Sequence, residues 1–213
     1  MKKNYIGFFI LFVLFAGCNS ATQSPQSADV IMPLAVGNAW YWNVEYYAPD
    51  GTLTGTGKDS LLITSKRTVG GEERYVLDTD ADIYYEGTAL VVNTHLFSHP
   101  FIWARYPMPL ATPEIIDTFV ITTEQSPDPI EDAEYIMTCI SNSTPITTPS
   151  GSYNTIKYKY ELIGMRSDTL HSTDISYYAL NVGPVMKEQF VLDTITNQNY
   201  RVSRSVLTKV TLK

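Results

Sequence analysis

The segment Ile156-Lys-Tyr-Lys-Tyr-Glu-Leu162 gives the clearest indication of the fold, because large apolar residues alternate strictly with charged ones. Side chains of a β-strand point alternately to the two faces of a sheet, so a period of two predicts a strand that is buried on one face. Trp40-Tyr-Trp-Asn-Val-Glu-Tyr-Tyr47 alternates in the same way and places its two tryptophans on one face. Residues 31–213 hold no comparable helical period, which favours an all-β chain.

Further windows with strand character follow one another along the chain, at residues 61–69, 74–77, 83–86, 90–94, 116–123, 135–140, 175–179, 186–192 and 200–212. Asp50-Gly51, Gly70-Gly71 and Ser150-Gly151 separate some of them and supply the positive φ that hairpin turns need. Two proline clusters, at residues 107–113 and 127–129, predict irregular connections.

One domain therefore spans residues 31–213. About ten or eleven strands in one domain predict a single antiparallel meander that curves into a half-barrel or a barrel-like sheet, with a β-sandwich as the alternative.

The N-terminus carries an export signal. Two lysines precede an apolar run from Tyr5 to Ala16, and this run is shorter than the roughly 20 residues that a membrane-spanning helix requires. Residues 1–17 are thus predicted to be a signal peptide. An ordinary secretory signal cut near Ala21 is the alternative to the lipoprotein signal described next.

Leu14-Phe-Ala-Gly-Cys18 resembles the lipobox of bacterial lipoproteins, except that Phe15 stands where that family usually has leucine. The resemblance implies that Cys18 carries the lipid and becomes the first mature residue, which ties the protein to a membrane. Residues 18–30 contain almost no large apolar residue, so they are predicted to form a flexible tether. Asn19 is not the aspartate that retains enteric lipoproteins in the inner membrane, which favours the outer membrane, facing the periplasm.

Charge and cysteine content exclude some partners and some chemistry. The chain has 15 basic and 22 acidic residues, and loss of Lys2 and Lys3 changes its net charge from −7 to −9. An acidic domain repels phosphate backbones, so nucleic acid is not an expected partner. With Cys18 lipidated, Cys139 has no partner for an intrachain disulfide.

Three segments resemble small uncharacterised envelope lipoproteins of Gram-negative bacteria. They are the P-L-x-V-G-N-x-W opening at residues 33–40, a P-x-G-x-aromatic turn at residues 149–153, and Y-Y-A-x-x-V-G-x-V-x-x-E at residues 177–188. The resemblance implies a curved sheet similar to the half-barrel of periplasmic lipoprotein carriers, and it implies no activity. In physical terms, Gly37 and Gly183 suit turns into strands and Trp40 begins an apolar face, so we interpret these positions as structural.

Asp78, Asp80 and Asp82 are a candidate cation site, because alternation would place their carboxylates on one side of an extended chain. An EF-hand loop that starts at Asp78 is excluded, since its sixth and twelfth positions hold Ile83 and Ala89. A solvated acidic turn is the simpler interpretation, and we expect no bound metal.

Other candidate groups indicate no catalytic site. His95 and His99 have a spacing that suits zinc only on a helix, and His171 is distant. Cys139 lies within a predicted strand and is expected to be a buried thiol. Paired carboxylates could cleave glycosides. The candidates are Glu45, Glu161 and Glu188, but the sequence does not place them near one another. We expect no enzyme activity and no cofactor.

Three Asp-Ser/Thr-aliphatic triplets, at residues 59–61, 168–170 and 193–195, resemble a short O-glycosylation signal of exported bacterial proteins. Such short patterns also arise by chance.

The sequence thus predicts a lipid-anchored envelope protein whose sheet binds an apolar or amphipathic ligand, either lipid-like or a glycan. The alternative is an interaction module that presents a filled barrel to other envelope proteins or to glycan. A cavity on the concave face would favour the first hypothesis.

Overall fold

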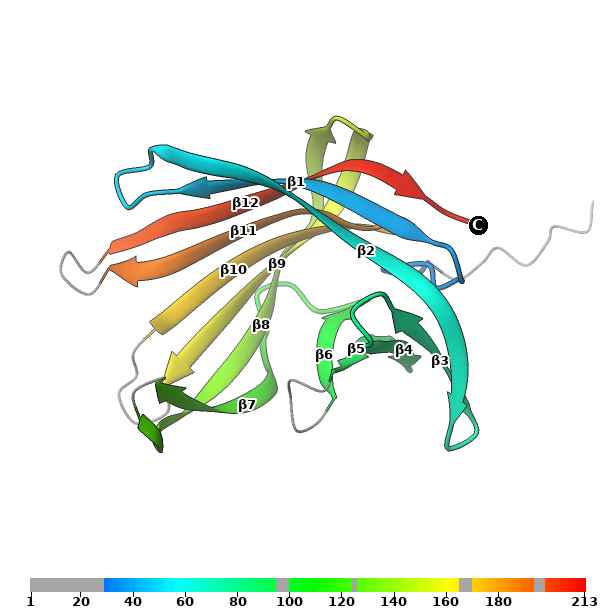
Figure 1. Ribbon diagram of the computed structural model, residues 1–213, viewed down its shortest axis with the longest axis horizontal. Coiled ribbons are helices and arrows are strands. Elements are labelled where there is room, and N and C mark those ends of the chain that lie inside the picture. The colour runs from blue at the N-terminus through cyan, green and yellow to red at the C-terminus, as the bar shows by residue number, and fades with distance from the viewer. Residues whose placement is uncertain (1–28, 95–99, 124–125, 165–169, 194–197) are drawn as a thin grey trace, which may run out of the picture.

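The computed structural model describes residues 29–94, 100–123, 126–164, 170–193 and 198–213, and they form one twelve-stranded sheet (Figure 1). The strands are β1 (Ala39–Tyr47), β2 (Leu53–Val69), β3 (Glu72–Leu77), β4 (Asp82–Glu86), β5 (Ala89–Asn93), β6 (Phe101–Arg105), β7 (Pro113–Thr123), β8 (Ser126–Thr148), β9 (Gly151–Gly164), β10 (Leu170–Ala179), β11 (Gly183–Asp193) and β12 (Gln198–Thr211). Within the described part of the chain, no helical segment has the length and apolar character that a membrane crossing requires.

The sheet is a meander that curls back on itself. Its order is β6-β5-β4-β3-β2-β1-β12-β11-β10-β9-β8-β7, so chain neighbours pair throughout and the first strand also pairs with the last. Every strand pairing is antiparallel, and the open edges are β6 and β7. Figure 1 shows β1 and β9 to β12 side by side in a curved sheet, with β3 to β6 facing its hollow side. The prediction of one curved antiparallel sheet is confirmed.

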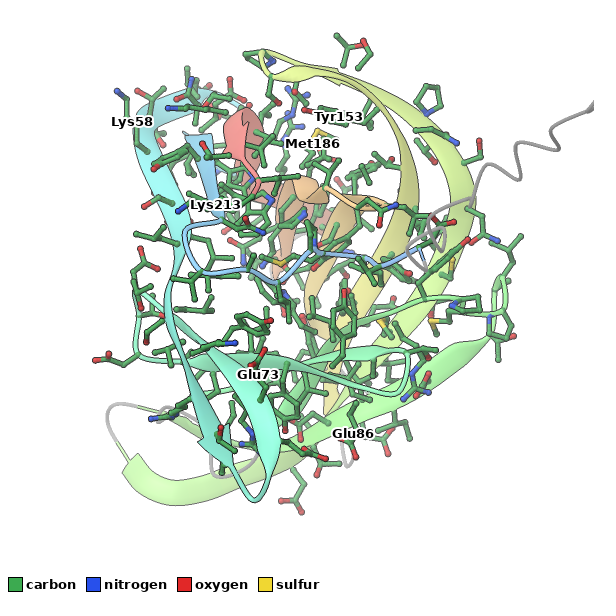
Figure 2. All side chains as sticks on the ribbon, turned by 90° about the vertical axis from the view of Figure 1, so that its right-hand side faces the viewer. Lys58, Glu73, Glu86, Tyr153, Met186 and Lys213 are labelled. Carbon is green, nitrogen blue, oxygen red and sulfur yellow. The ribbon has the colours of Figure 1, made fainter. Side chains whose placement is uncertain are left out.

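The core lies between this curved sheet and the strands β3 to β6. Trp40, Tyr158 and Tyr178 are fully buried on the concave face, and Ile83 and Leu90 pack against them from the opposite side. Figure 2 shows the side chains of both parts meeting in the space between them. The predicted buried face of β9 is therefore confirmed, because alternation directs its large apolar residues inward. That of β1 is confirmed for Trp40, Trp42 and Val44, whereas Tyr46 is 48% exposed.

Two of the segments that resemble envelope lipoproteins contact each other in this core. The Trp40 indole Nε1 donates a hydrogen bond of 2.6 Å to the backbone oxygen of Val182. Gly183, at a φ of +107°, lies so close that a Cβ atom there would be 2.9 Å from Trp40 Nε1. Asn38 is fully buried and accepts a hydrogen bond from the backbone nitrogen of Lys213. These positions have a structural role, as predicted.

The glycine pairs occur in the hairpin turns where the sequence places them. Gly51 lies between β1 and β2, and Gly70 and Gly71 connect β2 to β3. All three have a positive φ, a conformation that is unfavourable for residues other than glycine.

The segment that precedes β1 is bound to the domain. The backbone nitrogen and oxygen of Val30 both form hydrogen bonds with Asn181, and Met32 is fully buried beside the Tyr85 hydroxyl. Cys18, the predicted lipidation site, lies outside the described residues.

The main differences from the predicted strands concern β6 and β8, while β2 and β10 also begin earlier than predicted. Residues 101–105 form a strand that the alternation did not indicate. Strand β8 begins at Ser126 and includes residues 127–129, which were expected to form a connection. The count is therefore twelve strands, where about ten or eleven were predicted.

Candidate functional site

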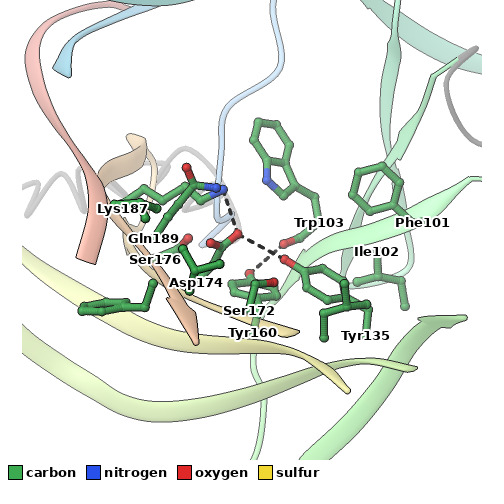
Figure 3. Close-up of a pocket in the computed structure, with 14 residues that line it drawn as sticks. Phe101, Ile102, Trp103, Tyr135, Tyr160, Ser172, Asp174, Ser176, Lys187 and Gln189 are labelled. Atoms are coloured by element: carbon green, nitrogen blue, oxygen red, sulfur yellow. Dashed lines mark hydrogen bonds and ion pairs between the residues drawn. The ribbon is translucent and has the colours of Figure 1, made fainter. Parts of the chain in front are cut away.

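A hollow of about 500 Å³ lies between β6 and the concave face of β8 to β11 (Figure 3). Strand β6 is positioned over this face by two tyrosine hydroxyls of β9. Tyr160 donates a hydrogen bond of 2.7 Å to the backbone oxygen of Trp103, and Tyr158 donates one of 2.6 Å to that of Arg105. The outer edge of β6 is therefore attached to the sheet by side chains, which leaves a cleft beside the attachment.

One wall of this cleft is aromatic. Phe101 and Trp103 enter it from β6, and Tyr135 and Tyr160 enter from β8 and β9. The rings of Tyr135 and Tyr160 stack with centroids 5.7 Å apart. Aromatic side chains offer large apolar surfaces, and they have few rotatable bonds, so little conformational entropy is lost when they are fixed. This wall is therefore suited to contact with a ligand.

The opposite wall carries polar side chains beside the apolar Phe190 and Val191, and Figure 3 shows the polar ones. The Asp174 carboxylate of β10 forms an ion pair of 2.9 Å with Lys187 of β11, and the Tyr135 hydroxyl lies 3.4 Å from the same carboxylate oxygen. Asp174 is 15% exposed and Lys187 44% exposed. Gln189 stands directly opposite Asp174 in the sheet register. Such polar side chains on a concave face are unusual for a core and typical of a binding site.

The tyrosine hydroxyls of the cleft act as hydrogen-bond donors. Burial, and next the negative charge of Asp174, raise the pKa of Tyr135 well above its usual range. Burial likewise raises the pKa values of Tyr160 and Tyr178. The phenols therefore stay protonated at neutral pH, where they act as hydrogen-bond donors and not as bases.

A second, smaller hollow of about 230 Å³ adjoins the cleft. Trp103 and Lys187 line both spaces, and Trp42 and Asp59 line the far side of the smaller one. A ligand longer than the cleft could thus extend past Trp103.

The aspartates of the candidate cation site do not converge. Asp80 has a φ of +62°, which interrupts the alternation, and Asp78 accepts a hydrogen bond from the backbone nitrogen of Leu62. Asp82 is buried and forms an ion pair of 2.7 Å with Arg67. Among the described residues, no three potential ligand side chains are grouped to hold a metal ion.

The three candidate glutamates also lie apart from the cleft. Each contacts a basic side chain: Glu161 with Lys159 at 2.8 Å, Glu188 with Arg201 at 2.7 Å, and Glu45 with Arg204 at 3.9 Å. They do not form the unpaired carboxylate couple that a glycosidase needs.

Cys139 is fully buried on β8, and burial raises the pKa of its thiol, as expected for a structural residue. Two histidines, His95 and His99, lie outside the described residues, as does Asp168. The backbone of His171 is part of β10. Asp59 and Ser60 of the first glycosylation-like triplet are exposed on β2.

The residues of the cleft itself were not among the sequence candidates. Strand β10 was predicted to begin at residue 175, which left Asp174 outside it, and Phe101 and Trp103 had no assigned element. A usable signal was present: Ser172, Asp174 and Ser176 alternate, so polar groups share one face of β10. The same pattern recurs at Lys187 and Gln189 on β11.

Comparisons with known proteins support the fold. No protein-family model and no curated protein matches the chain. A solved structure from Bacteroides fragilis, described as a predicted exported protein with a YmcC-like fold, aligns with a TM-score of 0.54 and 15% identity, covering 86% of this chain and 100% of that one. A predicted lipoprotein from Parabacteroides distasonis aligns with a TM-score of 0.52 and 16% identity, covering 87% and 100%. At this identity the likeness shows a shared fold.

Proposed function

We propose that this chain is a lipid-anchored protein of the cell envelope whose β domain binds an amphipathic ligand in the cleft under β6, without catalysing a reaction. The observation that carries the proposal is the cleft of about 500 Å³, in which an aromatic wall faces an ion-paired polar wall. A ligand site of this kind needs a largely preformed concavity with a few polar groups that fix orientation.

The proposed location is supported by the lipobox at Cys18 and by the descriptions of the two similar structures as an exported protein and a lipoprotein. Lipid on Cys18 would hold the chain at the outer membrane, facing the periplasm. Residues 19–28 would give the cleft distance from the bilayer, since their composition is that of a flexible linker.

A binding role is favoured over catalysis by the character of the cleft. Enzymes position acids and bases whose pKa values are displaced toward the working pH. The pKa values of Tyr135 and Tyr160 are displaced away from the working pH, because burial favours the neutral form of both side chains.

Native mass spectrometry tests this proposal. The full-length chain with Cys18→Ser, which blocks lipidation, is exported, purified gently and compared in native and denatured forms. We expect a reproducible additional mass that is lost on denaturation. Ser172→Phe, which fills the cleft, should remove that mass, whereas Ser65→Phe on the exposed part of β2 should retain it. Absence of any additional mass after incubation with envelope extract would contradict the proposal.

A second candidate function is a docking module for another envelope protein. It is favoured by exposed aliphatic side chains at the open edge near β7, where Leu110, Ile115 and Ile140 are 53%, 55% and 43% exposed. Cross-linking from these positions in whole cells, compared with cross-linking from the opposite edge of the molecule, would identify such a partner.

A further inference from the structure

We propose that the ligand of the cleft is an oligosaccharide, bound across the cleft and the smaller hollow that adjoins it. This inference rests on the proposed function, namely that the cleft binds a ligand, and it specifies the chemical class. Four features of the two hollows support it.

The first feature is the polar wall. Asp174 is mostly buried, and Ser176 and Gln189 lie beside it on the same concave face. Gln189 accepts a hydrogen bond from Ser203 through its amide oxygen, and its amide nitrogen forms no hydrogen bond within the described part of the chain. An alkyl chain laid over this wall would displace water without replacing its hydrogen bonds, which is unfavourable. Sugar hydroxyls both donate and accept, so they can replace that water.

The second feature is the aromatic wall that stands opposite these groups. A pyranose ring has a flat face of C–H groups and a rim of hydroxyls. Trp103 and Tyr135 offer ring surfaces to such a face while Asp174 and Gln189 are available to the rim. Figure 3 shows this separation, with Trp103 and Phe101 on one side of the cleft and Lys187 and Gln189 on the other. A ligand with alternating apolar faces and polar rims matches both walls at once.

The third feature is the series of two hollows. The cleft of about 500 Å³ and the hollow of about 230 Å³ share Trp103 and Lys187 as a common boundary. Beyond this boundary the same combination recurs, because Trp42 provides a ring and Asp59 a carboxylate. A repeated pairing of aromatic and polar groups suits a chain of similar units, with one unit on each side of Trp103.

The fourth feature is charge. The charged side chains that line the two hollows, within the described residues, are Asp174, Lys187 and Asp59. Lys187 is paired with Asp174 at 2.9 Å, so no net positive charge remains. A phosphate headgroup is therefore disfavoured, since its charge would need to be offset by cationic donors. The saccharide that fits is neutral or weakly charged.

The test measures binding to the full-length Cys18→Ser chain by calorimetry. The saccharide probes are maltohexaose and chitohexaose, which are both neutral, and palmitate is the lipid probe. We expect at least one saccharide to bind. Trp103→Leu retains apolar volume but removes the ring, so it should weaken that binding roughly tenfold.

Asp174→Asn should also weaken saccharide binding roughly tenfold, because it removes a charged acceptor. Glu161→Gln is the matched control, since Glu161 forms a similar ion pair of 2.8 Å on the opposite face of β9. Binding of palmitate alone, unaffected by Trp103→Leu, would overturn the inference and leave the proposed function intact. Binding of none of the probes, with no mass detected in the native experiment, would overturn both.

Discussion

Gly183→Ala should destabilise the fold strongly, because Gly183 combines an unfavourable backbone conformation with close packing. Its φ is +107°, and a methyl group there would lie 2.9 Å from Trp40 Nε1 and 3.2 Å from Met32 Cγ. Backbone strain of this kind costs about 1–3 kcal/mol, and an added methyl group in a packed core costs about 1–3 kcal/mol more. Trp40 cannot easily move away, since it is fully buried and its indole is hydrogen-bonded to Val182.

Gly71→Ala separates these two contributions. Gly71 has a φ of +91°, but no atom lies within 4 Å of a Cβ placed there. It should therefore show the backbone strain alone. Urea unfolding followed by tryptophan fluorescence measures both variants. We expect Gly183→Ala to lower the free energy of unfolding by roughly 2–6 kcal/mol, out of the 5–15 kcal/mol typical of a domain. Equal losses in the two variants would refute the packing argument.

Three further predictions concern buried polar groups. Tyr160→Phe removes the hydroxyl that holds Trp103 of β6, and should cost about 1–2 kcal/mol in urea unfolding, whereas Tyr46→Phe at an exposed site should have little effect. Asp82→Ala should cost about 2–3 kcal/mol because Asp82 is a buried partner of Arg67, and added calcium should leave the thermal midpoint of the unsubstituted chain unchanged. Stability should fall above about pH 10, where the unfolded chain releases protons that the folded chain retains, by about 1.4 kcal/mol per pH unit for each tyrosine whose pKa burial raises; unfolding midpoints near pH 8 and pH 11 test this for Tyr158, Tyr160 and Tyr178.

The overall fold was predictable because alternation and turn chemistry agree along most of the chain. On β9, the sequence indicates which face is buried, since Tyr158 and Tyr160 alternate with Lys157 and Lys159. Gly70 and Gly71 specify a tight turn that only two neighbouring antiparallel strands can use. A chain of such hairpins leaves a meander as the natural arrangement.

Strand β6 was not predictable from local pattern. Phe101–Arg105 is five residues long and four of them are apolar, so no alternation can be read from it. Its position is set by the hydroxyls of Tyr158 and Tyr160, which are distant in sequence. Nothing within the segment indicates that contact.

The start of β8 differs from the prediction for another reason, which concerns its prolines. Proline lacks the N–H that a central strand needs, but it is tolerated where one side of a strand is open. Strand β8 pairs with β7 from its first residue, Ser126, whereas its described pairing with β9 begins only at Ala133. Pro127 and Pro129 thus precede the two-sided part of the strand.

The open edge of β6 explains why the molecule has a cleft. A meander of twelve strands whose first and last strands pair could close into a barrel only if β6 and β7 also paired. Instead β6 folds toward the concave face, and its free edge is satisfied by tyrosine hydroxyls and not by a neighbouring strand. This arrangement protects an edge that would otherwise be free to pair with another chain. It also places Trp103 opposite Asp174 and Lys187, so the feature that keeps the sheet from closing is the one that creates the cleft.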